Sequence, residues 1–386
     1  MSSFDRSASI QTHGPCQSHF AKVRDAFKDN FRHRNEIGAA VCIIHNGEIV
    51  VDLWAGFKDQ AQSQPWEKDT LVCVMSTTKA IASIAVLSLV DKGLLSLDSP
   101  IANYWPEFAQ AGKEFITVKS LLTQLAGLPV VDGVEPDSYF KHYEAMEPAL
   151  AAQAPFWEPD STPCYHSFTY GPLCQVLIKK VTGKSLGTYL REELLNPLHV
   201  DFFIGLTDEE IQRCADIILQ PGIPTLEQIR TPGTLLNRAW QPLKLDSTLL
   251  RSKAFRCGEF ASGNGHSNAR GLAQIYDCLC QDYHDDAHRL LHRRTLRNAI
   301  KEQWHAQEKI SLRRFRYGTG FMLNNQHFHL GSNPNSFGHP GLGGPLGFAD
   351  PDKSLAFGYC CNHIKAFDDI GPCASALIQA TYECLG

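Results

Sequence analysis

Residues 76–79 read Ser76-Thr77-Thr78-Lys79 and stand at the head of an apolar run that continues to Lys92. If a helix starts at Ser76, positions i and i+3 share a face, so the Lys79 amine can reach the Ser76 oxygen. A serine becomes a good nucleophile only when a nearby base takes its proton. Burial and the positive end of a helix both lower the pKa of a lysine, which makes it such a base. The stretch therefore predicts a lysine-activated serine at the start of a buried helix.

A second Ser-x-x-Lys match runs from Ser138 to Lys141, so the surroundings must decide between the two. The run after Ser76 is apolar on nearly all sides, which is typical of a helix buried in a sizeable domain, and Gly93 ends it. Ser138 instead lies among acidic, glycine and proline residues that indicate a polar loop. We take Ser76 as the candidate nucleophile, with a plain buried N-cap serine as the alternative.

The composition is that of a soluble enzyme with two structural lobes. The chain has 386 residues, with 43% hydrophobic and 20% charged residues. A net charge of −5 argues against a nucleic-acid partner. The longest apolar stretch, residues 81–90, is too short to span a bilayer, so we expect no membrane partner. The N-terminal residues lack a signal-peptide layout, and the thirteen cysteines are expected as reduced thiols, so the predicted location is the cytoplasm.

Strand-like segments lie at both ends of the chain, and helical spacing lies between them. Residues 37–44 and 48–57 are β-rich runs joined at Asn46-Gly47, which predicts a hairpin, and residues 16–32 and 370–384 predict helices. Near the C-terminus the predicted strands are residues 317–323, 346–349 and 354–361. We predict a sheet lobe from residues 1–72 and 305–386, a mainly helical lobe from residues 73–304, and an active site between them.

Two further segments carry candidate catalytic groups. Tyr165 lies in Cys164-Tyr165-His166-Ser167, and a tyrosine near Lys79 would share protons with the amine, so that the two groups titrate as one unit. The stretch from Phe337 to Gly344 is rich in glycine and precedes a strand. Glycines let the backbone approach a ligand, and an N–H group there can face a developing oxyanion. The alternatives are a half-buried loop tyrosine and a tight strand entry with a structural histidine.

Together, Ser76-x-x-Lys79, Tyr165-x-Ser167 and His339-x-Gly341 resemble the ordered motifs of the serine β-lactamase and penicillin-binding-protein superfamily. The chain is most similar to the class C β-lactamase-like carboxylesterases, known as family VIII esterases. The resemblance covers nearly the whole chain. It implies an α/β fold of the α+β type, in which an antiparallel sheet flanked by helices carries an inserted, mainly helical lobe.

The resemblance also implies a role for each motif residue. Ser76 would be the acylated nucleophile, and Lys79 and Tyr165 its base system. The N–H groups of Ser76 and Leu342 would form the oxyanion hole. The remaining candidates for the oxyanion and substrate-binding set are Gly341, His339, Ser167 and Gln124. No metal or organic cofactor is implied.

Three departures from the family pattern bear on the substrate. β-Lactamases generally have a cationic Lys-Thr/Ser-Gly element where this chain has His339-Pro340-Gly341, and histidine is mostly neutral at pH 7. Ser167 stands where they have an asparagine that holds an acylamide side chain. Both changes favour esters over lactams. Gln124 stands where many of these esterases have a histidine, so the fit to the esterase pattern is imperfect.

Two other motifs compete with this interpretation. Gly183-Lys184-Ser185-Leu186-Gly187 matches a nucleophile elbow, but helical spacing precedes it where the elbow needs a strand, so Ser185 is predicted to cap a helix. Cys280, His284, His288 and His292 recur every four residues and could hold a metal on one helix face, although the stretch is more typical of a solvated surface.

We therefore predict a serine carboxylesterase that cleaves short-chain esters through an acyl-serine intermediate. The expected partner is a small-molecule ester, and the oligomeric state is either monomer or homodimer. The alternatives are, in order, a β-lactamase or D-amino-acid peptidase of the same superfamily and an acyltransferase. A non-catalytic binding or assembly module is the alternative from a different class.

Overall fold

A nine-stranded antiparallel sheet forms one half of the molecule. The computed structural model describes residues 10–140, 145–220, 231–240, 246–280, 289–365 and 369–386. Strands from both ends of the chain meet in this sheet, with β2 paired to β13, in the order β1-β3-β2-β13-β12-β11-β10-β9-β8. Their bounds are β1 Thr12–His13, β2 Gly38–His45, β3 Glu48–Gly56, β8 Trp304–Gln307, β9 Arg314–Tyr317, β10 Met322–Leu323, β11 Phe337–Pro340, β12 Leu346–Asp350 and β13 Leu355–Cys361.

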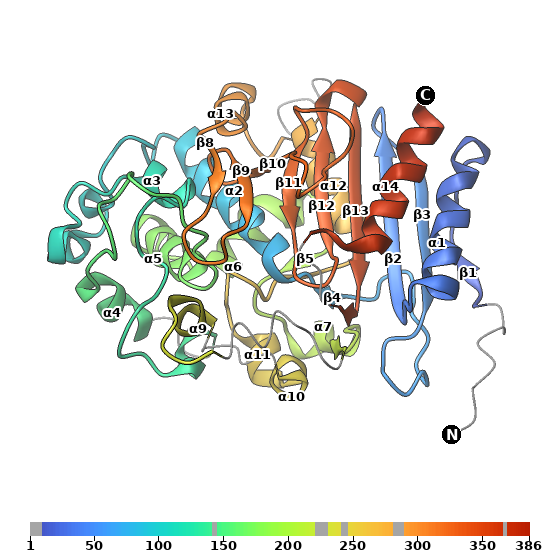
Figure 1. Ribbon diagram of the computed structural model, residues 1–386, viewed down its shortest axis with the longest axis horizontal. Helices are drawn as coiled ribbons and strands as arrows, with labels where there is room; N and C mark the ends of the chain where they lie inside the picture. Colours follow the sequence, from blue (N-terminus) through green and yellow to red (C-terminus); the bar gives the residue numbers. More distant parts are fainter. Residues whose placement is uncertain (1–9, 141–144, 221–230, 241–245, 281–288, 366–368) are drawn as a thin grey trace.

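Helices cover both faces of this sheet. α1 and α14 pack against each other on one face, and α12 packs on β2, β12 and β13 (Figure 1). α2 packs against α5 and β11. The helix bounds are α1 Ala21–His33, α2 Thr78–Asp91, α3 Val118–Leu122, α4 Met146–Ala152, α5 Tyr170–Thr182, α6 Leu186–Tyr189, α7 Asp208–Gln212, α9 Leu235–Trp240, α10 Ser247–Arg251, α11 Lys253–Cys257, α12 Ala269–Cys280, α13 Arg293–Ala299 and α14 Gly371–Leu385.

Two small sheets complete the fold. β4 (Val72–Cys73), β7 (His266–Ser267) and β5 (Phe202–Phe203) form a three-stranded sheet, and β14 (His363–Ile364) pairs in parallel with β6 (Ile218–Leu219). β4 leads directly into the turn that carries Ser76. The helices α3, α4, α5 and α9 gather at one end of the molecule, and β2, β3, α1 and α14 lie at the other (Figure 1).

The predicted fold class is confirmed, because an antiparallel sheet made from both ends of the chain is flanked by helices. The predicted hairpin turns at Asn46 and Gly47, and both residues have the positive φ that a two-residue turn of this kind needs. The division into lobes at residues 72 and 305 stays a prediction. α12 falls within the range assigned to the helical lobe, yet it covers the sheet.

The single strand predicted for residues 317–323 is wrong. β9 ends at Tyr317, and β10 begins at Met322 after a tight turn. The N–H group of Gly318 donates to the Phe321 carbonyl at 2.9 Å, and Gly320 has a φ of +89°. The two glycines allow the chain to reverse within a segment whose apolar residues suggested an uninterrupted strand.

Close contact between α12 and the sheet depends on two facing glycines. Gly347 on β12 pairs with Gly358 on β13. A Cβ at Gly347 would lie 2.3 Å from the Tyr276 ring, and one at Gly358 would lie 2.1 Å from the Ala269 carbonyl. The absence of side chains at these two positions therefore lets the helix backbone lie directly on the sheet.

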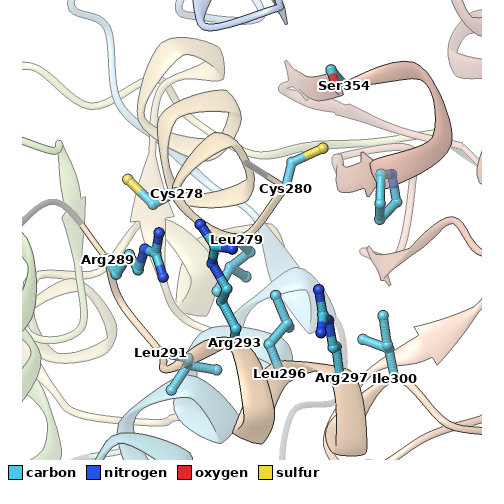
Figure 2. A pocket seen from close by; sticks show the side chains of 11 residues that line it. Cys278, Leu279, Cys280, Arg289, Leu291, Arg293, Leu296, Arg297, Ile300 and Ser354 are labelled. Atoms are coloured by element: carbon cyan, nitrogen blue, oxygen red, sulfur yellow. The ribbon is translucent and has the colours of Figure 1, made fainter. Parts of the chain in front are cut away.

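A cavity of 310 Å³ lies between the C-terminal end of α12 and α13. Figure 2 shows Arg289, Arg293 and Arg297 around it, together with Cys278 and Cys280. None of the residues that line this cavity belongs to the predicted catalytic or substrate-binding set. The predicted histidine series between Cys280 and His292 has members, His284 and His288, that lie outside the described residues.

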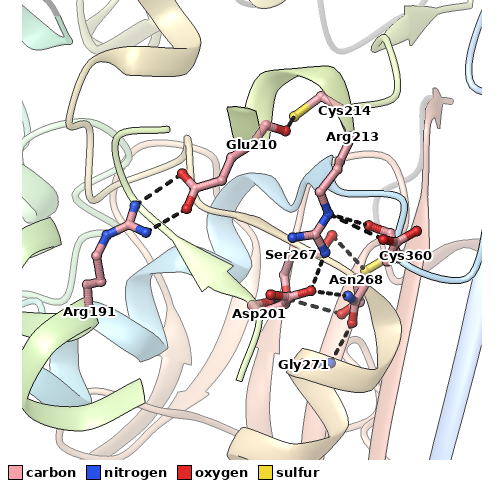
Figure 3. A network of polar contacts seen from close by, with 10 residues as sticks. Arg191, Asp201, Glu210, Arg213, Cys214, Ser267, Asn268, Gly271 and Cys360 are labelled. Atoms are coloured by element: carbon pink, nitrogen blue, oxygen red, sulfur yellow. Dashed lines mark hydrogen bonds and ion pairs between the residues drawn. The ribbon is translucent and has the colours of Figure 1, made fainter. Parts of the chain in front are cut away.

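A polar network holds the start of α12 in place (Figure 3). Asn268 accepts a hydrogen bond from the Gly271 N–H at 2.8 Å and so caps the helix. The Asn268 amide also donates to Asp201 at 3.1 Å, and Arg213 pairs with the same carboxylate. These contacts connect the chain before β5 to the helix that covers the sheet.

Candidate active site

Ser76 is presented by a sharp turn at the edge of the core. It lies in a 3-10 turn, Met75–Thr77, which runs directly into α2. Met75 has a φ of +48°, a backbone conformation that costs a non-glycine residue about 1–2 kcal/mol. Ser76 is partly exposed, whereas every other residue from Leu71 to Leu89 is buried. The turn therefore exposes the Ser76 hydroxyl within a segment that is otherwise buried.

Lys79 lies below this hydroxyl, as the spacing predicts. Its Nζ atom is 3.2 Å from Ser76 Oγ and 2.7 Å from the Ser262 carbonyl oxygen, to which it donates. The Lys79 side chain is buried, and burial holds the pKa of its ammonium well below the usual range. This shift favours the neutral amine, which can donate to Ser262 and still offer its lone pair to the Ser76 hydroxyl proton.

Tyr165 completes a three-residue cluster. Its side chain interacts with that of Ser76, which acts to lower the pKa of the phenol, and Lys79 Nζ lies 4.9 Å from the centre of its ring. Burial raises the pKa of Tyr165, against the lowering effects of the Ser76 bond and the Arg313 charge. The phenol is therefore protonated at neutral pH, which favours a proton shuttle over a resident phenolate. The three predicted catalytic residues are brought together in the structure.

The glycine-rich segment after β11 lies against the Ser76 turn. A Cβ at Gly341 would be 2.3 Å from the Val74 carbonyl oxygen, so only glycine fits there. Thr77 Oγ1 also donates to the Pro345 carbonyl at 3.4 Å. This packing brings Leu342, which is partly exposed, next to the turn that carries Ser76.

His339 and Gln124 belong to one buried hydrogen-bond chain. His339 Nδ1 lies 2.7 Å from the Pro340 carbonyl oxygen, and its Nε2 lies 3.1 Å from the Tyr317 hydroxyl. The Gln124 amide donates to the same hydroxyl at 2.6 Å. Burial lowers the pKa of His339 to about 3, so the ring is neutral at pH 7. Both side chains are buried, whereas Ser167 and Leu342, which were predicted for the same oxyanion and substrate-binding set, are partly exposed.

Several residues near Tyr165 were missed by the sequence analysis. Phe315 stacks on the Tyr165 ring with 5.4 Å between centroids, and Glu308 accepts a hydrogen bond from the Tyr165 N–H at 3.0 Å. Phe315 is buried although it lies within the basic run of residues 313–316. The alternation Arg314-Phe315-Arg316-Tyr317 indicates a strand with one buried face, because a strand places Phe315 and Tyr317 on the same side.

The competing serine is a helix cap. Ser185 Oγ accepts a hydrogen bond from the Thr188 N–H at the start of α6, and the preceding α5 occupies the place where a nucleophile elbow needs a strand. The cap prediction for Ser185 is confirmed. Within the described ranges, no group of three or more metal-ligating side chains comes together, and no helix has the length and apolar character to cross a membrane.

Comparison with known proteins places this geometry in a family. Residues 25–371 match the family model described as Beta-lactamase. The chain is 29% identical to an esterase/beta-lactamase, LipL, of Mycobacterium tuberculosis over 371 residues, which cover 91% of this chain and 83% of the relative.

Two solved structures resemble the whole chain. A family VIII carboxylesterase has a TM-score of 0.89 and 34% sequence identity over 97% of this chain and 100% of its own. A penicillin-binding protein homolog from Caulobacter crescentus has a TM-score of 0.86 and 34% identity over the same shares. The family model and these alignments extend across both the sheet and the helices around Ser76. The chain therefore belongs to the beta-lactamase family, with a family VIII carboxylesterase among its structural neighbours.

Proposed function

We propose that this chain is a serine carboxylesterase that hydrolyses short-chain esters through an acyl-Ser76 intermediate. The observation that carries the proposal is the partly exposed Ser76 hydroxyl 3.2 Å from a buried lysine amine of lowered pKa. The similarity to a family VIII carboxylesterase and to LipL supports ester substrates.

In the proposed mechanism, the neutral Lys79 amine and the Tyr165 phenol take the Ser76 proton as Ser76 Oγ attacks the ester carbonyl. The N–H groups of Ser76 and Leu342 stabilise the tetrahedral oxyanion. The intermediate collapses to an acyl-serine, and the proton held by the pair passes to the leaving alkoxide. Water then attacks the acyl carbon, and the pair takes a proton from that water. The second tetrahedral intermediate collapses, the pair returns the proton to Ser76 Oγ, and the carboxylic acid leaves.

The neutral His339 favours esters over lactams. A β-lactam carries a carboxylate that a cation can bind, and a charge-assisted hydrogen bond of that kind contributes about 1.5–3 kcal/mol. A buried histidine with a pKa of about 3 supplies no such charge at pH 7. Loss of this contact corresponds to a loss of roughly 10- to 100-fold in lactam binding.

The test compares p-nitrophenyl butyrate with a chromogenic cephalosporin in the wild type and in Ser76→Ala. We expect rapid release of nitrophenol, slow or absent cephalosporin turnover, and loss of both in the variant. Fast Ser76-dependent cephalosporin turnover would instead make a β-lactamase the better assignment. An absence of turnover and of any covalent adduct with either compound would favour a non-catalytic module.

We also propose that the protein acts in the cytoplasm on a small-molecule ester. All thirteen cysteines are free thiols, and most are buried, as expected for a chain kept reduced. Fractionation of the native cells checks this location. Recovery of the protein with intramolecular disulfides from an extracytoplasmic fraction would contradict it.

A further inference from the structure

The backbone around Tyr165 is fixed through three consecutive N–H groups. Cys164 N–H donates to the Gln124 carbonyl at 3.2 Å, and His166 N–H donates to Gln124 Oε1 at 2.6 Å. Between them, Tyr165 N–H donates to Glu308 Oε2 at 3.0 Å. Two residues that are distant in sequence therefore hold the tyrosine segment from its two sides.

Gln124 is itself rigidly placed. It follows Thr123, the C-cap of α3, with a φ of +62°, and its side chain is buried. Its amide nitrogen donates to the Tyr317 hydroxyl at 2.6 Å, while its amide oxygen accepts from His166. With both ends of the amide engaged, the side chain has one orientation, and that orientation sets the position of the His166 backbone.

Glu308 fixes the segment from the β8–β9 hairpin. Its buried carboxylate accepts from the backbone N–H of Ile310 at 3.1 Å and from the backbone N–H and hydroxyl of Ser311, as well as from Tyr165. The Lys309 N–H also donates to the Pro163 carbonyl at 3.1 Å. The tip of the hairpin and the tyrosine segment are thus joined as one unit.

The aromatic contacts of Tyr165 do not fix it to the same degree. Phe315 stacks on the ring, and stacked rings tolerate a range of lateral offsets. The hydroxyl must nevertheless stay within hydrogen-bond reach of Ser76 Oγ, where a displacement of 1 Å can cost about 100-fold in rate. The directional hydrogen bonds of the backbone are therefore the contacts that set the distance between the Tyr165 hydroxyl and Ser76 Oγ.

We propose that Gln124 and Glu308 are positioning residues that hold the Tyr165 hydroxyl at Ser76. The inference rests on the proposed acyl-serine mechanism. Neither residue touches the substrate or the reacting atoms, since both side chains are buried and bonded within the protein. They affect the reaction only by fixing the position of Tyr165.

The test uses Gln124→Met, which keeps the side-chain length and removes both amide contacts, and the pair Glu308→Ala and Glu308→Gln. Each variant is titrated with a fluorophosphonate, so that kcat is expressed per Ser76 able to react. We expect Gln124→Met and Glu308→Ala to lower kcat by roughly 10- to 100-fold with KM little changed. Glu308→Gln keeps an oxygen for the Tyr165 N–H and is expected to recover part of that loss.

Asn30→Leu is the matched control. Asn30 is a buried amide on α1 that donates to the Cys373 carbonyl and accepts from Arg34, on the sheet face opposite α12. We expect this variant to lower Tm and leave kcat per titrated site unchanged. If Gln124→Met and Glu308→Ala behave like Asn30→Leu, with a lower Tm and a wild-type kcat, the two residues are merely structural and the inference is wrong.

The proposed function can fail separately from this inference. If wild-type protein shows no turnover that Ser76→Ala abolishes, the acyl-serine mechanism itself is wrong. If one Gln124 or Glu308 variant does not fold, the other and the graded Glu308 pair still decide the outcome, because each probes a different hydrogen bond of the same segment.

Discussion

Ser76→Ala is expected to reduce ester turnover by at least about 10⁴-fold. The substitution removes the oxygen that would carry the acyl group, and neither the buried Lys79 amine nor the partly buried Tyr165 phenol can replace it as a nucleophile. The backbone N–H groups proposed for the oxyanion hole remain, so a small residual rate above that in water is expected. Turnover of p-nitrophenyl butyrate and intact-protein mass after a fluorophosphonate measure the effect.

The fold should tolerate this change. Ser76 is partly exposed in its turn, and an alanine there leaves no buried group without a partner except the Tyr165 hydroxyl. The matched control is Ser185→Ala, which removes a helix cap and is expected to cost about 1 kcal/mol of stability without loss of turnover. If Ser76→Ala kept its activity and Ser185→Ala lost it, the assignment of Ser76 as the nucleophile would be wrong.

The parts of the site that follow from local spacing could be predicted from the sequence. Ser76 and Lys79 are one turn apart, so their contact depends only on helix geometry. The hairpin at Asn46-Gly47 depends only on turn chemistry, and both residues have the expected positive φ. The location of Tyr165 beside them came from the family resemblance, since nothing local brings residues so distant in sequence together.

The residues that surround Tyr165 could not be predicted in the same way. Glu308 is 143 positions away from Tyr165, and a single glutamate near a basic run has no local feature that marks it as buried. Gln124 was recognised as a departure from the family pattern and grouped with substrate-binding residues. Its fixed orientation depends on Tyr317 and His166, which only the folded chain brings to it.

Lys79→Met is expected to lower ester turnover by roughly 10²- to 10⁴-fold, the usual contribution of a general base. Methionine keeps the length of the side chain and suits a helix interior, so the change removes the amine with little loss of packing. The Ser262 carbonyl loses its donor, which costs about 1–3 kcal/mol, while the buried amine no longer opposes folding when it is protonated. The activity assay is the same ester hydrolysis, normalised to folded protein.

The stability of the same variant shows whether the Lys79 amine is neutral at the pH of catalysis. In the unfolded chain Lys79 binds a proton up to about pH 10.4, whereas burial makes the folded protein release that proton at lower pH. Between the two pKa values the unfolded state binds more protons, so wild-type stability rises with pH, and Lys79→Met lacks this rise. The Tm of the wild type minus that of the variant should therefore increase from neutral pH towards about pH 10.

Lys92→Met, at the C-cap of the same helix, is the control that separates the effect of burial from that of charge alone. Partial burial acts to lower the pKa of Lys92, but its hydrogen bonds to Tyr189 and Glu193 raise it above that of an ordinary lysine. Lys92 therefore stays protonated in both the folded and the unfolded protein until the pH reaches the pKa of an ordinary lysine. Its Tm difference should stay flat over the window in which the Lys79 difference climbs. Parallel, flat curves for both variants would mean that the folded protein keeps the Lys79 ammonium charged. Catalysis at neutral pH would then have to begin from a protonated lysine, and Tyr165 would have to be a phenolate in order to take the first proton from Ser76.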